Sequence, residues 1–137
     1  MLKNRILLPA LFFASCILLF AEEISFRADS MSGTAGNNNS TTTLKGNAFV
    51  KTESIEISAE KITLSGNDFR YIKAEGKVSA NNTESQIEFS CGKLTFDRET
   101  EVALLEKDVK LSDKENEVTA DAQMIEYRQK TGTVILQ

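Results

Sequence analysis

Apolar and polar residues alternate along most of the chain, and the pattern is clearest just before its middle. Ile55, Ile57 and Ala59 alternate with polar residues, and the apolar positions then resume at Ile62 and Leu64, one residue out of phase. Alternation with a period of two indicates a β-strand with one buried and one exposed face. A shift of one residue inside such a strand indicates a bulge or a corner.

The same pattern occurs four times, each time with a small residue just before the shift. These small residues are Ala28, Ala59, Cys91 and Ala120. The copies follow one another at about 30 residues, and a fixed period of this size is typical of a repeat architecture. A second pattern lies between the copies and places Gly46, Gly76 and then Lys107 at equivalent positions. We interpret these glycines as positions of a bulge or of close strand approach.

Strand patterns cover the chain after residue 21, and helical periodicity is not found there. We therefore predict an all-β domain of about ten short strands, two in each repeat, stacked into an elongated roll. A hairpin turn is predicted at 65–68, with positive φ at Gly66 and Asn67, and a loop at 33–41. The predicted strand segments are 22–32, 42–52, 55–64, 69–80, 86–96, 102–111, 118–127 and 133–136, of which 22–32 and 86–96 each also contain a corner.

The first 21 residues differ from the rest of the chain. Lys3 and Arg5 precede an apolar stretch at 6–21 that is short for a membrane span. A basic start, a short apolar core and a terminal small residue predict a secretory signal peptide that ends at Ala21, followed by one domain at 22–137. A retained N-terminal anchor and a lipoprotein signal ending at Cys16 are the alternatives.

Charge and residue types restrict the chemistry. The net charge is −4 with no basic run, which argues against nucleic-acid binding, and the chain has no histidine, which excludes Ser-His-Asp triads and histidine metal sites. Beyond the signal, Cys91 is the single cysteine, and we interpret it as a small buried residue.

Acidic residues recur directly after the small residue of the repeat, at Asp29, Glu60 and Asp121. Such a set could be catalytic or bind calcium, but a residue that repeats with the fold is more simply a turn acid that accepts backbone N–H bonds. We therefore expect no enzyme activity, no catalytic residues, no metal and no cofactor.

Four groups of residues are informative together: 57–62, 74–78, 120–121 followed by 125–127, and 131–136. These segments resemble the OstA/LptA family of lipopolysaccharide-transport proteins. The resemblance implies a β-jellyroll in which two antiparallel sheets face each other in a V, with an apolar interior that holds acyl chains. It also implies a periplasmic location and head-to-tail pairing of edge strands. The chain departs from the family at Cys91 and Gly92, where Ala-Asp is usual, which suggests an altered corner.

The inward apolar face is the remaining candidate for activity. In an ordinary sandwich this face fills the core, whereas two diverging sheets leave a groove in which each buried methylene contributes about 0.8 kcal/mol. The candidate lipid-binding residues are Phe26, Met31, Val50, Ile57, Ile62, Val78, Phe89, Leu94, Phe96, Val109, Val118 and Tyr127.

The resemblance predicts a periplasmic bridge that carries lipopolysaccharide or a similar acylated glycolipid towards the outer membrane. Its expected partners are LptC-like and LptD-like jellyroll domains, or further copies of itself, paired through edge strands. The alternatives are an LptC-like component anchored in the inner membrane and a structural β-repeat protein that binds no lipid.

Overall fold

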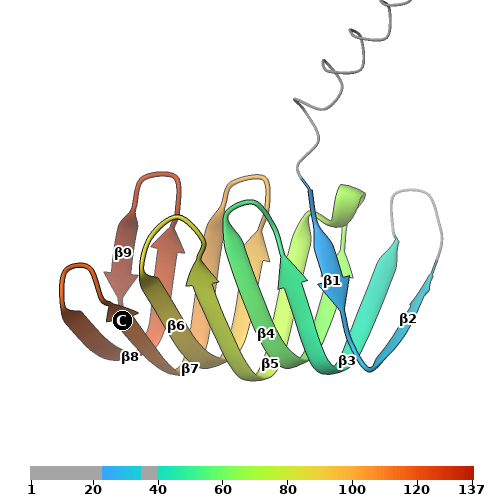
Figure 1. The fold of residues 1–137 in the computed structure, drawn as a ribbon, viewed down its shortest axis with the longest axis horizontal. Coiled ribbons are helices and arrows are strands. Elements are labelled where there is room, and N and C mark those ends of the chain that lie inside the picture. The colour runs from blue at the N-terminus through green and yellow to red at the C-terminus, as the bar shows by residue number, and fades with distance from the viewer. Residues whose placement is uncertain (1–22, 35–39) are drawn as a thin grey trace, which may run out of the picture.

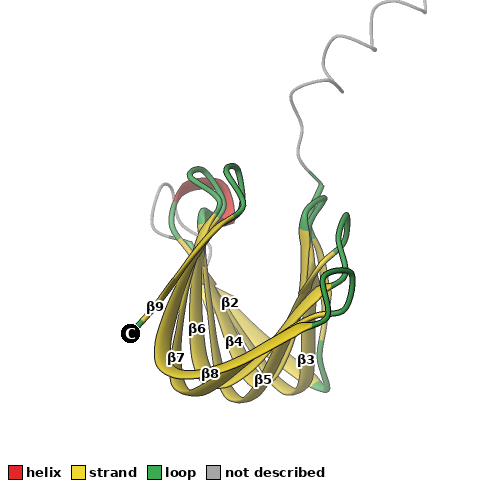
Figure 2. Ribbon diagram, turned by 90° about the vertical axis from the view of Figure 1, so that its left-hand side faces the viewer, coloured by secondary structure: helices red, strands yellow, loops and turns green. Residues whose placement is uncertain are grey.

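A computed structural model describes residues 23–34 and 40–137 and shows one antiparallel sheet folded along its middle (Figures 1 and 2). The strand order is β1-β3-β4-β5-β6-β7-β8-β9, and β2 also pairs with β3. Within the described residues, one short 3-10 turn, η2 (Asn67–Phe69), interrupts the strands. The strands are β1 (Ser25–Arg27), β2 (Ser30–Thr34), β3 (Thr41–Lys51), β4 (Ile55–Ser65), β5 (Tyr71–Asn82), β6 (Ile87–Asp97), β7 (Val102–Asp113), β8 (Val118–Arg128) and β9 (Thr133–Leu136).

The all-β prediction is confirmed, and the central strands have about the predicted lengths, while the strand and corner predicted at 22–32 correspond to β1 and β2. β3 to β8 each have 11 or 12 residues and run through both layers. The two layers are therefore two halves of one sheet, bent where the sequence predicted a corner. We call the half that contains β1 arm A, and the half that contains β2 and β9 arm B. Figure 2 shows the two arms facing each other.

A line of bulges forms the corner between the arms. Pairing of β3 with β4 shifts between Lys45 and Ala48, so that Gly46 and Asn47 lie opposite the single residue Glu60. Gly46 and Asn47 have φ values of 81° and 48°. A bulge with left-handed residues bends the strand sharply, which turns the chain from arm B into arm A.

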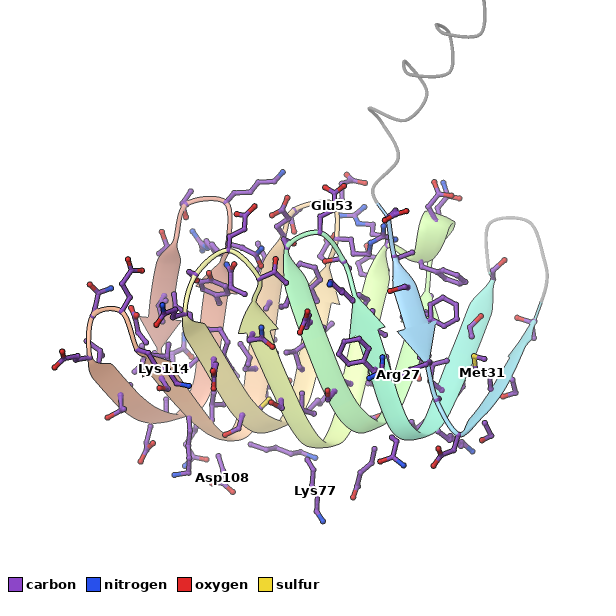
Figure 3. All side chains as sticks on the ribbon, viewed as in Figure 1. Arg27, Met31, Glu53, Lys77, Asp108 and Lys114 are labelled. Atoms are coloured by element: carbon purple, nitrogen blue, oxygen red, sulfur yellow. The ribbon has the colours of Figure 1, made fainter. Side chains whose placement is uncertain are left out.

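The same bulge recurs on every second strand. Gly76 and Lys77 of β5 have φ values of 84° and 48°, and Lys107 and Asp108 of β7 have values of 72° and 53°. The sheet register shifts at each of these pairs. Lys77 and Asp108 project from the outside of the corner (Figure 3). The interpretation of the repeated glycines as bulge positions is confirmed.

Each bulge faces one side chain on the neighbouring strand. A Cβ atom added to Gly46 would lie 2.7 Å from Asp29 Oδ2, and one added to Gly76 would lie 3.0 Å from the Cβ of Glu60. At the third corner the roles are exchanged, since a Cβ added to Gly92 would lie 2.8 Å from the Cβ of Lys107. The altered corner expected at Gly92 is therefore present. At this corner the glycine lies on β6, beside the bulge of β7, whereas at the first two corners it lies in the bulge itself.

Besides shifts of one or two residues in the strand bounds, three details of the prediction are wrong. Gly33 and Thr34 belong to β2 rather than to a loop, while 35–39 lie outside the described residues. In the turn before β5, positive φ occurs at Gly66, Asp68 and Phe69 rather than at Asn67.

The third error concerns the fourth copy of the repeat. Its corner is at Gln123, because the β7–β8 register passes from Glu106–Met124 to Val109–Ala122. Asp121 therefore lies before the corner on the outer face, where its carboxylate is 3.6 Å from Lys110 Nζ. The predicted signal segment lies outside the described residues, and within the described ranges no helix is long and apolar enough to cross a membrane.

Candidate functional site: the inner face and its mouth

The inner faces of the two arms pack against each other through apolar side chains. Most of the predicted lining residues are almost fully buried, for example Ile57 and Ile62 at 0 % exposure and Phe89 at 3 %. The sequence-based list missed equally buried residues of the same face. The missed residues are Leu44, Leu64, Ile72, Leu105 and Ile125. Their alternation in the strands was the signal that could have found them.

Some of the predicted lining residues lie at the ends of the roll rather than in its centre. Met31 pairs with the buried Leu44 and therefore shares the inner face, yet it is 57 % exposed. Val118 shares the inner face at the other end and is 48 % exposed. Phe26 is half-buried. Figure 3 shows Met31 at the β2 end of the molecule.

The exposed ends result from a stagger between the arms. Phe26 of β1 contacts Phe69, the last residue of η2 between β4 and β5, and Asn82 of β5 contacts Tyr127 of β8. Each strand of arm A therefore faces a later strand of arm B. Consequently β2 extends past arm A at one end, and the first half of β8 extends past arm B at the other.

Both ends also carry unpaired strand edges. β9 pairs with the second half of β8 only, through residues Ile125 to Arg128, so the edge of β8 before the corner has no neighbour within the described chain. At the opposite end, β1 and β2 pair with β3 on one side only. Free backbone N–H and C=O groups on such edges can pair with a strand of another chain.

The mouth of the fold is opposite the corner, where side chains from the two arms meet. Asn82 Nδ2 donates a hydrogen bond of 2.9 Å to the Tyr127 hydroxyl, and both residues are buried. The Tyr127 ring lies 5.1 Å from the Phe89 ring. Gln129 Nε2 donates to the Ser54 carbonyl at 3.0 Å. These contacts close the mouth between the arms at this point.

Each arm has a rigid rim of stacked turns beside the mouth. On arm B, the Arg70 guanidinium donates two hydrogen bonds, of 2.9 and 2.8 Å, to the Asp97 carboxylate. These bonds lower the pKa of Asp97 to about 2 and raise the pKa of Arg70. On arm A, hydrogen bonds from Asn116 lower the pKa of Asp113. The rims carry polar contacts that fix the turns.

The acidic corner residues and Cys91 make contacts within the fold. Asp29 accepts a hydrogen bond of 3.0 Å from the Asn47 side chain, and its own backbone N–H donates to Gly46 O. Glu60 packs over Gly76. Cys91 is buried with its thiol 3.3 Å from Lys93 O, and burial raises its pKa to about 11, which keeps it protonated at neutral pH.

Comparison with known proteins identifies the family. The model of the LptA/(LptD N-terminal domain) LPS transport proteins matches residues 27–136. The chain belongs to this family. A search of curated proteins gave no match.

Solved structures show the same fold. LptH from Pseudomonas aeruginosa, described as the LptA homologous periplasmic component of the lipopolysaccharide transport device, superposes with a TM-score of 0.75. The two sequences are 13 % identical, and the match covers 84 % of this chain and 82 % of LptH. The predicted OstA/LptA family and jellyroll architecture are therefore confirmed, with the sheet left open rather than closed into a barrel.

Proposed function

We propose that this protein is a periplasmic carrier that shelters the acyl chains of lipopolysaccharide or a similar glycolipid between its arms. Family membership supports the transport role. The observation that carries the proposal is the inner face itself, which is mainly apolar from end to end and remains exposed at Met31 and Val118, beyond the closed centre. A chain lying on this face gains about 0.8 kcal/mol for each methylene removed from water.

The unpaired edges at both ends support transfer between molecules. A second jellyroll that pairs with β8 and β9, or with β1 and β2, would extend the sheet and continue the apolar face. Partners of this kind are further copies of the chain or related domains of the LptC and LptD type. A cargo could then move from one molecule to the next while staying in similar surroundings.

Photo-crosslinking tests the cargo. A photoreactive phenylalanine analogue replaces Ile57, which is buried on the inner face, and in a control replaces the exposed Ser58 on the opposite face. We expect adducts with an acylated glycolipid only from position 57 when cells are irradiated. Adducts from both positions, or from neither, would contradict sheltering between the arms.

Light scattering tests the end-to-end pairing. We expect the mass of the purified protein to rise with concentration, and Val118→Glu to reduce this rise because a charge then lies on the exposed inner edge of β8. Tyr71→Glu is the matched control, since Tyr71 is exposed at 40 % on the outer face. A protein that stays monomeric at every concentration would contradict the proposed end-to-end pairing.

The dense packing of the interior favours a second candidate, a structural β-repeat protein without cargo. Leu94 and Leu105, for example, are 0 % exposed. Filaments that form without any lipid adduct at position 57 would support this candidate. N-terminal sequencing of the mature protein separates both candidates from an anchored LptC-like component, which would keep Met1.

A further inference from the structure

Four residues at the mouth form what we call the clasp: Ser54 and Asn82 on arm A, and Tyr127 and Gln129 on arm B. Its two cross-arm hydrogen bonds are Asn82 to Tyr127 at 2.9 Å and Gln129 to Ser54 at 3.0 Å. We propose that the clasp is a gate, with Tyr127 as its main residue: it holds the arms closed, and the interior opens sideways when it releases.

The clasp connects elements that the sheet does not. Asn82 and Tyr127 belong to β5 and β8, which are not neighbours in the strand order. The Tyr127 hydroxyl is reached from arm A by Asn82, and its ring is contacted from arm A by Phe89. Tyr127 is 2 % exposed. One side chain of arm B therefore carries both a directional and an apolar contact with arm A.

Release of the clasp leaves the rest of arm A intact. The Asn82 side-chain oxygen accepts from the backbone N–H groups of Glu84 and Ser85, at 2.7 and 3.2 Å, so the amide stays fixed to its own turn. The Ser54 carbonyl likewise accepts from the backbone N–H of Thr83 at 3.2 Å. When the arms separate, the Asn82 amide and the Ser54 carbonyl keep these bonds and lose only their partners on arm B, the Tyr127 hydroxyl acceptor and the Gln129 amide donor.

The clasp is also less completely bonded than the sheet around it. Gln129 Oε1 is buried and accepts no hydrogen bond from the described residues. A buried acceptor without a donor weakens the closed state, because opening exposes it to water. A gate that must open repeatedly requires this kind of marginal closure.

The corner allows the arms to change their angle. Regular pairing is interrupted at each bulge, for example between Lys45 and Ala48 and between Glu75 and Val78. A rotation about this line therefore bends the chain where few ladder bonds are present. The corner acts as the hinge, and the clasp acts at the greatest distance from it.

Distance measurements between spin labels test the gate without any cargo. The labels are placed at Glu53→Cys on the rim of arm A and Lys130→Cys on the rim of arm B, both exposed, in a Cys91→Ala background. We expect a longer and broader distance distribution in Tyr127→Phe than in the parent. Tyr71→Phe, the same chemical change on the outer face, should leave the distribution unchanged.

A second variant guards against a folding defect at the buried Tyr127. Gln129→Ala removes the bond to Ser54 from a half-buried turn residue, and we expect a smaller change in the same direction. Distributions that match the parent in both Tyr127→Phe and Gln129→Ala would overturn the gate.

Uptake of a fluorescent fatty acid, cis-parinaric acid, tests whether the gate is the route by which an acyl chain enters. This part of the proposal rests on the proposed carrier function. We expect Tyr127→Phe to take up the probe roughly fivefold faster than Tyr71→Phe, the factor that one lost hydrogen bond corresponds to. Joining the two introduced rim cysteines with a bismaleimide should abolish uptake. Altered distances with no probe binding in any variant would uphold the gate and overturn the carrier function; equal uptake rates would overturn the gate as an entry route.

Discussion

The corner and the mouth of the folded sheet are held by residues with different separations in the chain. At the corner, Glu60 packs on Gly76 of the adjacent strand, and the same contact returns with the repeat. At the mouth, Asn82 meets Tyr127 and Ser54 meets Gln129, with separations of 45 and 75 residues. The repeat therefore builds the bend, whereas the stagger of the arms decides what closes it.

The exchanged glycine at the third corner offers the strongest test of this difference. Gly92→Ala should lower the free energy of unfolding by about 2–3 kcal/mol, because the new methyl group would lie 2.8 Å from the Cβ of Lys107. In a Lys107→Gly background the same change should cost less than about 1 kcal/mol, since the obstructing side chain is gone.

Urea denaturation of the four proteins in this double-mutant cycle gives the coupling free energy. Lys107→Gly by itself should be neutral or stabilising, because Lys107 has a φ of 72°. An equal cost of Gly92→Ala in both backgrounds would show that the two residues do not share one site.

The second corner should show the next largest effect. Gly76→Ala combines a positive φ of 84° with contact on Glu60, so we expect a loss of about 2 kcal/mol. Gly132→Ala is the control, since Gly132 has a φ of 72° but no atom within 4 Å of the added Cβ, and it should cost about 1 kcal/mol. Identical thermal and urea stabilities would contradict the packing role of Glu60.

A change at the mouth should lower the free energy of unfolding by less than a change at the corner does. Tyr127→Phe removes one buried hydrogen bond and leaves the Asn82 amide without its acceptor, for an expected loss of about 1–2 kcal/mol. Tyr71→Phe on the outer face should change stability by less than about 0.5 kcal/mol. A calorimetric melting temperature that falls equally in both variants would indicate that the clasp contributes nothing.

The rim of arm B should contribute the smallest effect, and it depends on pH. The pKa of Asp97 is lowered to about 2 by Arg70, so its contribution is complete above the ordinary value near 4 and is lost as the pH falls through 2. Both side chains are partly exposed, which limits the expected loss to about 1 kcal/mol.

Stability measured between pH 5 and pH 2 in the parent and in Asp97→Asn isolates this pair from other carboxylates, such as Asp113. The variant should show the shallower pH dependence. Parallel curves would assign the acid sensitivity to other groups.

The sequence predicted the corner well because the corner depends on local pattern. The phase shift after Ala59 and the repeated glycines at Gly46 and Gly76 each mark one strand's passage between the arms. The fourth corner was misplaced because Ala120 and Ala122 both fit the small position, and only the pairing of Ala122 with Val109 decides between them. Alternation alone does not fix such a register.

The mouth was not predictable in the same way. Nothing near Asn82 in the sequence indicates Tyr127, since their contact depends on how far one arm is displaced along the other. The apolar face itself was predictable, yet its division into a closed centre and exposed ends at Met31 and Val118 was not. Polar residues such as Gln129, which lies between two predicted strands, carried no signal of their role.

The stagger of the arms has a genetic consequence if molecules join end to end. Each junction would then be built from β2 of one molecule and β8 of the next, so each molecule would supply only part of the apolar face there. A defect confined to one end, such as a charge at Val118, would leave the chain folded but would interrupt every assembly that includes it. Expressed beside the normal allele, such a variant should be dominant, and its severity should rise with its share of the pool.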